Sequence, residues 1–223
     1  MFIAGLRKFS LVDYPGKVAA VVFTPYCNMR CTYCHNYHIL GAGTQTISTD
    51  EVTGFLQKRA GFLDAVVISG GEPTLRPDLP EFIRLVREMG YLIKLDTNGT
   101  NPKQLLSMIR EGLIDFVAMD IKAPVSKYRE ITQVDDDLSS ITKSINIIKN
   151  CGLDYEFRTT FAPQLTSEDI EQIAREITPA KSFILQQYVP RKKEDPPAHS
   201  SGELERAADL ARDILGVCLI RND

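Results

Sequence analysis

The 223-residue sequence lacks the features of several common classes of protein. It has no excess of positive charge, because 26 lysine and arginine residues are outnumbered by 29 aspartate and glutamate residues. A basic balance usually marks nucleic-acid binding, so the composition indicates no nucleic-acid partner. No window approaches the roughly 18 consecutive apolar residues of a membrane-spanning helix, and the first residues do not have the layout of a signal peptide. We therefore expect a cytoplasmic protein without membrane contact.

Cysteine is scarce and unevenly distributed. Three of the five cysteines, Cys27, Cys31 and Cys34, lie within a short stretch. This clustering fits a reducing compartment and metal binding better than disulfide bonds. Cys151 and Cys218 stand alone, and we expect them to behave as small buried hydrophobic residues.

The spacing C-x3-C-x2-C places three thiolates on a loop that follows an apolar run. A [4Fe–4S] cluster is usually held by four thiolates, so three would leave one iron free to bind another ligand. A zinc site would need a fourth protein ligand, which His35 or His38 could supply. Three unrelated core thiols are a further alternative. The spacing favours the cluster and leaves the other two interpretations open.

Apolar runs alternate with amphipathic segments along the chain. The Val-rich run 17–24 is typical of a strand buried on both faces of a parallel sheet. Further strands are expected at residues 65–69, 91–95, 116–121, 155–161 and 183–188, with a short last strand at 217–220. Helices are expected at residues 50–60, 79–89, 102–110, 137–150, 167–177 and 203–215.

Six strand–helix units predict an α/β fold with a parallel sheet and outer helices, two units short of a closed eightfold barrel. The length suits a single domain spanning residues 1–223. Within it we expect an extended N-terminal segment at residues 1–16, a barrel core at residues 17–188, and a C-terminal loop and helix at residues 189–223.

Polar motifs follow the second and third predicted strands, at the end where parallel α/β barrels carry their active sites. The stretch Ser69 to Pro73 contains Gly70-Gly71-Glu72. Paired glycines let a ligand approach the backbone closely, although a tight turn would use them too. The stretch Asp96 to Gly99 follows the third strand, where an Asx-type turn is the structural alternative.

Charged residues occur on the fourth and fifth predicted strands. Asp120 and Lys122 point to the same face of a strand, so they form a structural ion pair or complement a charged ligand. Arg158 interrupts an apolar strand, and it needs a partner if it points inward or snorkels if it points outward. The stretch Gln186 to Tyr188 ends the sixth strand, and alternation alone does not decide which of its residues faces inward.

The stretch Cys27 to Asn36 resembles the cluster loop of radical S-adenosylmethionine (SAM) enzymes, whose signature is C-x3-C-x-aromatic-C. The continuation His35-Asn36 is similar to the branch of activating enzymes, such as the pyruvate formate-lyase activating enzymes, that install glycyl radicals on partner enzymes. The flanking run Ser10 to Gly16 is similar to the class of anaerobic ribonucleoside-triphosphate reductase activating proteins. The resemblance extends to about Tyr188.

This resemblance implies a partial (β/α)6 barrel, open on one side, which is the radical SAM core. It implies that the three clustered cysteines hold a [4Fe–4S] cluster whose open iron binds SAM. Asp96 and Thr97 match positions that help to build a monovalent-cation site in the pyruvate formate-lyase activating enzymes. The residues expected to contact SAM are Tyr33, His35, Gly70, Gly71, Glu72, Asp96, Thr97, Asp120, Lys122 and Arg158.

The implied reaction is reductive cleavage of SAM to a 5′-deoxyadenosyl radical. In the activating branch this radical removes hydrogen from a glycine of a partner enzyme, here by resemblance an anaerobic ribonucleotide reductase, with flavodoxin or ferredoxin as the electron donor. One alternative is a small-molecule radical SAM enzyme of the 7-deazaguanine-forming type, whose loop more commonly reads Trp-Cys-Asp. The other is a non-catalytic Cys3His zinc module, which does not explain the polar motifs at successive strand ends.

Overall fold

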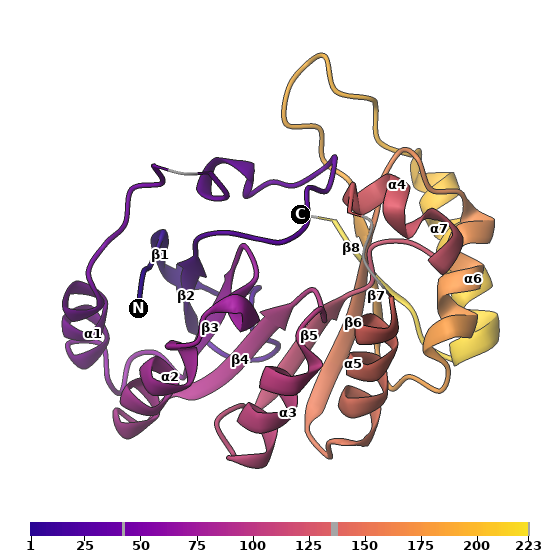
Figure 1. Ribbon diagram of the computed structural model, residues 1–223. Coiled ribbons are helices and arrows are strands. Elements are labelled where there is room, and N and C mark those ends of the chain that lie inside the picture. Colours follow the sequence, from indigo (N-terminus) through magenta and orange to yellow (C-terminus); the bar gives the residue numbers. More distant parts are fainter. Residues whose placement is uncertain (42, 135–137, 223) are drawn as a thin grey trace.

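A curved sheet of parallel strands, covered by helices on its outer side, forms the body of the molecule (Figure 1). We describe it from a computed structural model that covers residues 1–41, 43–134 and 138–222. The strands in these residues are β1 (Gly5–Ser10), β2 (Ala19–Thr24), β3 (Ala65–Gly70), β4 (Leu92–Thr97), β5 (Phe116–Asp120), β6 (Asp154–Phe161), β7 (Phe183–Gln187) and β8 (Leu219–Arg221). The α-helices are α1 (Thr49–Gln57), α2 (Leu79–Glu88), α3 (Pro102–Arg110), α4 (Tyr128–Thr132), α5 (Ser139–Asn150), α6 (Ser167–Ile177) and α7 (Ser201–Leu215).

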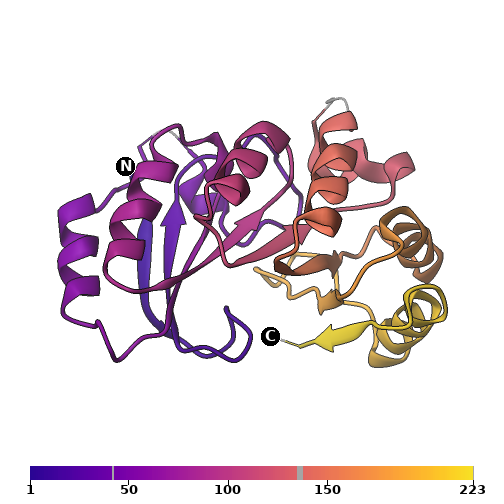
Figure 2. The same ribbon diagram turned by 90° about the horizontal axis from the view of Figure 1, so that it is seen from below.

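The strands lie side by side in chain order from β1 to β8. β1 runs antiparallel to β2, and each later neighbouring pair is parallel. β1 and β8 are the two edges of the sheet and do not pair with each other, which leaves the barrel open between them (Figure 2). The predicted α/β partial barrel is confirmed.

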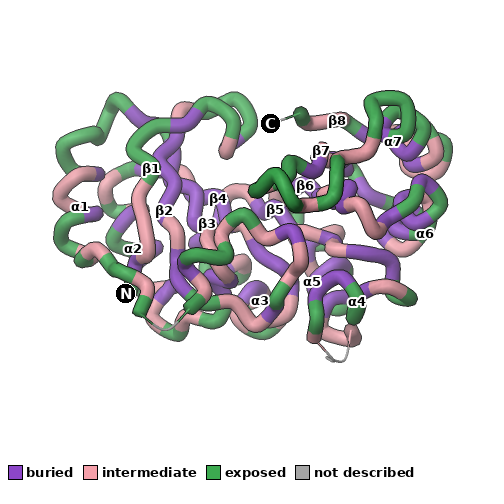
Figure 3. Tube along the Cα trace, turned by 90° about the horizontal axis from the view of Figure 1, so that it is seen from above, coloured by how far each residue is buried: buried purple, intermediate pink, exposed green. Residues whose placement is uncertain are grey.

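The first parallel strands are apolar on both faces, which explains their uninterrupted apolar sequence. On β3, Val66 and Ile68 pack into the main core with the outer helices, whereas Ala65 and Val67 belong to a smaller cluster inside the barrel. Tyr14, from the loop after β1, covers this inner cluster. The inner cluster therefore gives the barrel an apolar floor, and Figure 3 shows that the strands are largely buried.

The inner face becomes polar toward the carboxyl ends of the strands. Side chains alternate with a period of two, so the inner positions of β4 pass from Leu92 through Lys94 to Asp96. The parallel register places Asp120 of β5 directly beside Arg158 of β6. The same alternation that buries an apolar floor thus gathers charged groups at the end where an active site is expected.

Some predicted element bounds differ from the observed ones. α7 begins earlier than predicted because Ser200 caps it, with the Ser200 Oγ accepting from the Glu203 N–H and the Glu203 carboxylate accepting from the Ser200 N–H. α1 ends earlier because its last turn tightens, with the Arg59 N–H donating to the Leu56 carbonyl (2.9 Å). Of the predicted helix 137–150, Asp137 lies outside the described residues, and α5 is described from Ser139.

Two segments gain structure that the sequence pattern did not predict. The N-terminal segment contributes β1 to the sheet rather than only preceding it. α4 has five residues, which is too short to show a helical period. In the part of the chain that the structure describes, no helix has both the length and the apolar character needed to cross a membrane.

We expect Phe157→Ala to destabilise the protein by about 3 to 5 kcal/mol, because the side chain is fully buried and its loss leaves a cavity. Phe62→Ala is a matched control, since the Phe62 side chain is 76% exposed, and it should change stability by less than about 0.5 kcal/mol. Urea unfolding measures both values. Equal losses would contradict the assignment of Phe157 to the core.

Candidate active site

The three clustered cysteines lie on the loop that follows β2, at the carboxyl end of the first parallel strand. Their thiols are free and half-buried, and they line one cavity of about 390 Å³. The loop turns back on itself where the Cys34 N–H donates to the Cys31 carbonyl (3.1 Å). It also rests on α4, whose carbonyls at Ile131 and Thr132 accept backbone N–H groups of the loop.

The cavity wall combines the cysteine loop, the glycine turn after β3 and the charged ends of β4 to β6. The predicted contact residues that line it are Cys27, Cys31, Tyr33, Cys34, His35, Gly70, Gly71, Asp96, Thr97, Asp120, Lys122 and Arg158. Gln186 and Gln187 also line it, whereas Tyr188 is not among the lining residues. The fold therefore gathers almost the whole predicted set, and the role of each residue toward SAM stays a prediction.

The glycine turn passes directly beneath the start of the cysteine loop. The Gly71 N–H donates to the Thr24 carbonyl (2.8 Å), and the Glu72 N–H donates to the Tyr26 carbonyl (2.7 Å). A Cβ atom on Gly71 would lie 1.8 Å from the Tyr26 oxygen, and Gly70 adopts a φ of +116°. The paired glycines are thus required by the contact between two protein loops, in addition to any contact with a ligand.

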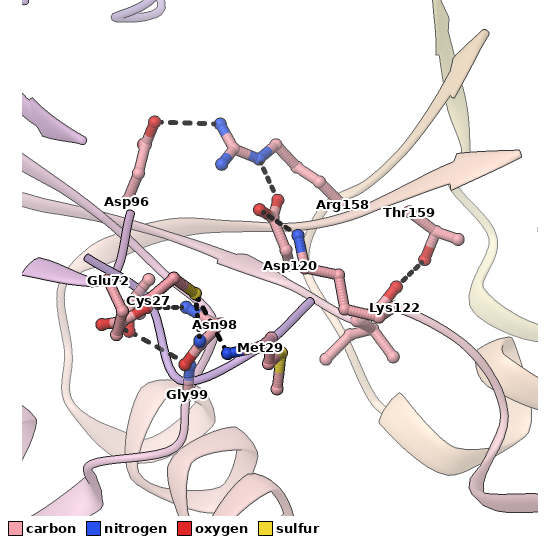
Figure 4. A network of polar contacts seen from close by, with 12 residues as sticks. Cys27, Met29, Glu72, Asp96, Asn98, Gly99, Asp120, Lys122, Arg158 and Thr159 are labelled. Atoms are coloured by element: carbon pink, nitrogen blue, oxygen red, sulfur yellow. Dashed lines mark hydrogen bonds and ion pairs between the residues drawn. The ribbon is translucent and has the colours of Figure 1, made fainter. Parts of the chain in front are cut away.

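Glu72 lies beneath the cavity rather than in its wall. Its carboxylate is buried and accepts hydrogen bonds from the Thr74 N–H (3.0 Å), the Thr97 hydroxyl (2.8 Å) and the Asn98 N–H (2.6 Å). Figure 4 shows Glu72 beside Asn98. Burial raises the pKa of Glu72, while these donors act in the opposite direction. The side chain joins the glycine turn to the end of β4, and the contact of Glu72 with SAM stays a prediction.

Asn98 is a cavity residue that the sequence analysis assigned only to a turn. Its side-chain amide donates toward the Cys27 sulfur (3.6 Å) and to the Asn28 side-chain oxygen (3.0 Å). The Met29 N–H points at the same sulfur (3.4 Å). Hydrogen bonds to cluster sulfurs raise the reduction potential of iron–sulfur centres. The only signal in the sequence was the amide in the motif Asp96 to Gly99, whose spacing from Cys27 gave no hint of contact.

Arg158 points inward and has partners, so the snorkelling alternative is wrong. Its Nε donates to Asp120 (2.8 Å), and its Nη1 lies 3.4 Å from Asp96 (Figure 4). Asp120 also pairs with Lys122 (2.9 Å). The structural ion pair predicted for Asp120 and Lys122 is therefore present, and both residues line the cavity as well.

Two further charged residues extend this row into the barrel. Lys94 is buried, and it donates to Asp96 (2.9 Å) and to the Asp13 carbonyl (2.7 Å). The buried Glu156 lies 3.6 Å from Lys94 and 3.8 Å from Arg158. Lys94 and Arg158 already neutralise Asp96, and the Thr97 hydroxyl donates to Glu72. The monovalent-cation site expected at Asp96 and Thr97 stays a prediction.

The environment shifts several pKa values. Burial opposes ionisation of Asp96 and Asp120, but the adjacent Arg158 holds the pKa of both carboxyl groups below the usual range. Burial alone would lower the pKa of Lys122, and the Asp120 charge raises it. Burial raises the pKa of Cys27 to about 11 and also raises that of Cys31. Metal binding by these thiols would therefore release protons.

The geometry distinguishes between the two kinds of metal site. In the described ranges 1–41, 43–134 and 138–222, no three His, Cys, Asp or Glu side chains gather closely enough to hold one metal ion. A zinc knuckle with His35 or His38 needs four ligands around one ion and is not assembled in these residues. In a [4Fe–4S] cluster the thiolates are spread over several irons, and three free thiols on one cavity wall fit that arrangement.

Comparison with known proteins supports the same interpretation. The model of the radical SAM superfamily matches residues 21–177. A protein of Methanocaldococcus jannaschii, named provisionally as a glycyl-radical enzyme activating enzyme, is 35% identical, covering 98% of this chain and 95% of its own. The pyruvate formate-lyase-activating enzyme of Clostridium pasteurianum is 29% identical over 77% of this chain and 74% of its own.

A solved structure shows a similar fold. SuiB of Streptococcus suis, in a crystal structure with bound S-adenosylmethionine, superposes with a TM-score of 0.70 at 15% identity. The match covers 91% of this chain and 51% of SuiB, so the chain spans about half of that protein. At this identity the likeness concerns the fold alone.

We expect Gly71→Ala to reduce iron retention at least about tenfold, because the added methyl group would displace the backbone that leads into the cysteine loop. Gly54→Ala is the control, since the Cβ of this α1 residue would meet open space. Iron per protein after anaerobic reconstitution and gel filtration measures the effect. Equal iron contents in the two variants would show that the close approach is not required.

We expect Asp120→Asn to destabilise the protein at pH 7 by about 1 to 3 kcal/mol, because the substitution removes the carboxylate that pairs with Lys122 and one of the carboxylates that pair with Arg158. The folded-state pKa of Asp120 is depressed, so its contribution is present above the ordinary value of about 3.9 and is lost as the pH falls through the lower, folded-state value.

Urea unfolding at pH 7 and pH 3 tests this expectation. The stability difference between Asp120→Asn and the native protein should shrink at the lower pH. Asp209→Asn is the control, since it removes one partner of an exposed surface pair with Arg212 and should cost less than about 1 kcal/mol. A difference that stays constant with pH would contradict the depressed pKa.

Proposed function

The chain belongs to the radical SAM superfamily, and we propose that it is an activating enzyme that generates a glycyl radical on a partner protein. Enzymes of this superfamily use a [4Fe–4S] cluster and SAM. The observation that carries the proposal is the convergence of three thiols, a glycine turn and charged strand ends on one cavity. Similarity to an activating enzyme along nearly the whole chain supports the class of partner.

In this proposal Cys27, Cys31 and Cys34 hold the cluster. When bound and reduced, the cluster supplies the electron that cleaves SAM to methionine and a 5′-deoxyadenosyl radical. The donors to Cys27 from Met29 and Asn98 stabilise the negative charge on that sulfur. The protein thereby both binds the cluster and adjusts the energy of its reduced state.

The charged residues at the strand ends would orient SAM. Lys122 and Arg158 present cations, and Asp120 presents an anion, to a cavity that must accept a methionyl group with both charges. Their mutual ion pairs hold them in place before any ligand binds, which reduces the cost of ordering them on binding. Tyr33 and His35 lie on the cysteine loop in the same wall, where the resemblance places contacts with SAM.

The open side of the barrel would admit the substrate. Arg7 and Asp13, which lie near the β1 edge, line the cavity together with Gln187 and Val189 from the opposite side. A cavity reached from both sides of the opening suits a loop of a protein substrate. We propose an anaerobic ribonucleotide reductase as the partner, on the resemblance of the run Ser10 to Gly16, and a flavodoxin or ferredoxin as the electron donor.

We expect the anaerobically reconstituted and reduced protein to form 5′-deoxyadenosine from SAM, and Cys31→Ala to reduce that yield at least about tenfold, because one cluster ligand is lost. Cys151→Ala is the matched control, since this thiol lies at the end of α5 and donates to the Ile148 carbonyl. Chromatography of the quenched reaction measures the product. Equal yields from both variants would refute the assignment of Cys31.

The partner is tested separately. Candidate glycyl radical enzymes are added to the reduced protein with SAM, and the glycyl radical is recorded by EPR. A signal that depends on SAM and on Cys31 supports the activating function. Formation of 5′-deoxyadenosine without a glycyl radical on any candidate would leave the radical chemistry intact and favour a small-molecule substrate.

A further inference from the structure

The loop between β7 and α7, residues 188–200, reaches the cysteine loop from the other end of the chain. In Figure 1 this loop projects beyond the carboxyl ends of the strands. Its Arg191 donates through Nη1 to the Cys34 carbonyl (3.0 Å) and through Nη2 to the Thr32 carbonyl (2.9 Å), across 157 and 159 residues of sequence. A guanidinium carries several N–H donors in a rigid plane, so one side chain fixes two backbone groups of the turn that carries Cys34.

Arg191 is itself held in place. The Asp195 carboxylate lies 3.5 Å from its Nε and accepts hydrogen bonds from the Arg191 N–H (2.9 Å) and the Lys192 N–H (3.0 Å). The guanidinium carbon also lies 5.1 Å from the centre of the Tyr37 ring, which adds a cation–π contact. Of these contacts, those with Asp195 come from the loop that carries Arg191, so they orient the guanidinium independently of the cysteine loop and its two hydrogen bonds require little further ordering.

The cysteine loop has separate anchors for its parts. The stretch around Cys27 rests on the glycine turn and is contacted by Asn98. The middle of the loop rests on α4. The stretch around Cys34 is held by Arg191, and the following Asn36 donates to the Gly70 carbonyl (2.9 Å). Of these anchors, Arg191 comes from the far side of the open barrel.

We infer that Arg191 is a positioning residue for the cysteine loop, which fixes the Cys34 thiol relative to Cys27 and Cys31. The inference rests on the proposed three-cysteine cluster site and is independent of the partner protein. Arg191 also joins the loop after β7 to the loop after β2 across the opening of the barrel. The metal-binding loop is therefore held from both sides of the opening.

The charge of Arg191 adds a second consequence. Reduction adds an electron to the cluster, and a cation close to a cluster ligand stabilises the more negative state. Removing the charge should therefore lower the midpoint potential. A lysine keeps the charge but loses the planar pair of donors, so the two substitutions separate the electrostatic role from the positioning role.

The test compares Arg191→Met and Arg191→Lys with Lys192→Met. The control removes one positive charge from the same loop. The Lys192 side chain is exposed, and its substitution keeps the backbone N–H that donates to Asp195. Hydrogen exchange of residues 31–37 is measured in the iron-free protein. Iron retention and the midpoint potential are measured after anaerobic reconstitution, with the potential followed by EPR.

We expect Arg191→Met to exchange about tenfold or more faster in residues 31–37, to lose iron faster by a similar factor, and to show a lower potential. Arg191→Lys should show the faster exchange and iron loss with a potential near that of the native protein. Lys192→Met should match the native protein in all three measurements.

Behaviour of both Arg191 variants that is indistinguishable from Lys192→Met would overturn the inference. If Arg191→Met does not fold, Arg191→Lys decides the positioning role alone. A native protein that takes up no iron would refute the proposed cluster function instead, and hydrogen exchange in the iron-free protein would still decide whether Arg191 holds the loop.

Discussion

Buried charges need partners of opposite charge, and this requirement determines the arrangement of residues at the carboxyl ends of the barrel strands. Arg158 is almost fully buried and is neutralised by Asp96 and Asp120 on the two strands before its own. A buried ion loses several kcal/mol of hydration unless opposite charge and hydrogen bonds replace it. The parallel register places Asp120 of β5 directly beside Arg158 of β6, and it places Asp96 of β4 beside Ala118, two residues before Asp120. These neighbouring strands therefore assemble a group of fixed charges facing the cavity.

The second constraint is the close contact between loops at the ends of neighbouring strands. Gly71 leaves room for the backbone at Tyr26, and Glu72 ties the same turn to the end of β4. The cysteine loop is therefore bound to the sheet through backbone and buried side chains rather than through exposed contacts. A loop held in this way can keep three thiols in one arrangement, which a multi-iron cluster requires of its ligands.

Much of the fold and of the site could be predicted from the sequence. The alternation of apolar runs and amphipathic segments predicted the parallel sheet and the outer helices, because burial on both faces demands uninterrupted apolar strands. The position of polar motifs after strands predicted that Gly70, Asp96 and Asp120 would share one cavity, since parallel strands end at one edge of the sheet. The buried position of the Glu72 carboxylate, which binds Thr97 and Asn98, could not be predicted, because the sequence does not show where a carboxylate in a turn points.

The sequence by itself determined the spacing of the cysteines, the strand–helix alternation and the chemical character of the strand ends, since each depends on residues close together in the chain. Only the tertiary structure decided which distant groups meet them. Three contacts arise from segments that chain folding brings together: the amide of Asn98 at Cys27, the ammonium of Lys94 near Glu156, and Arg191 at the Cys34 turn. Local pattern carries no information about such contacts, because their formation depends on the packing and register of the whole sheet.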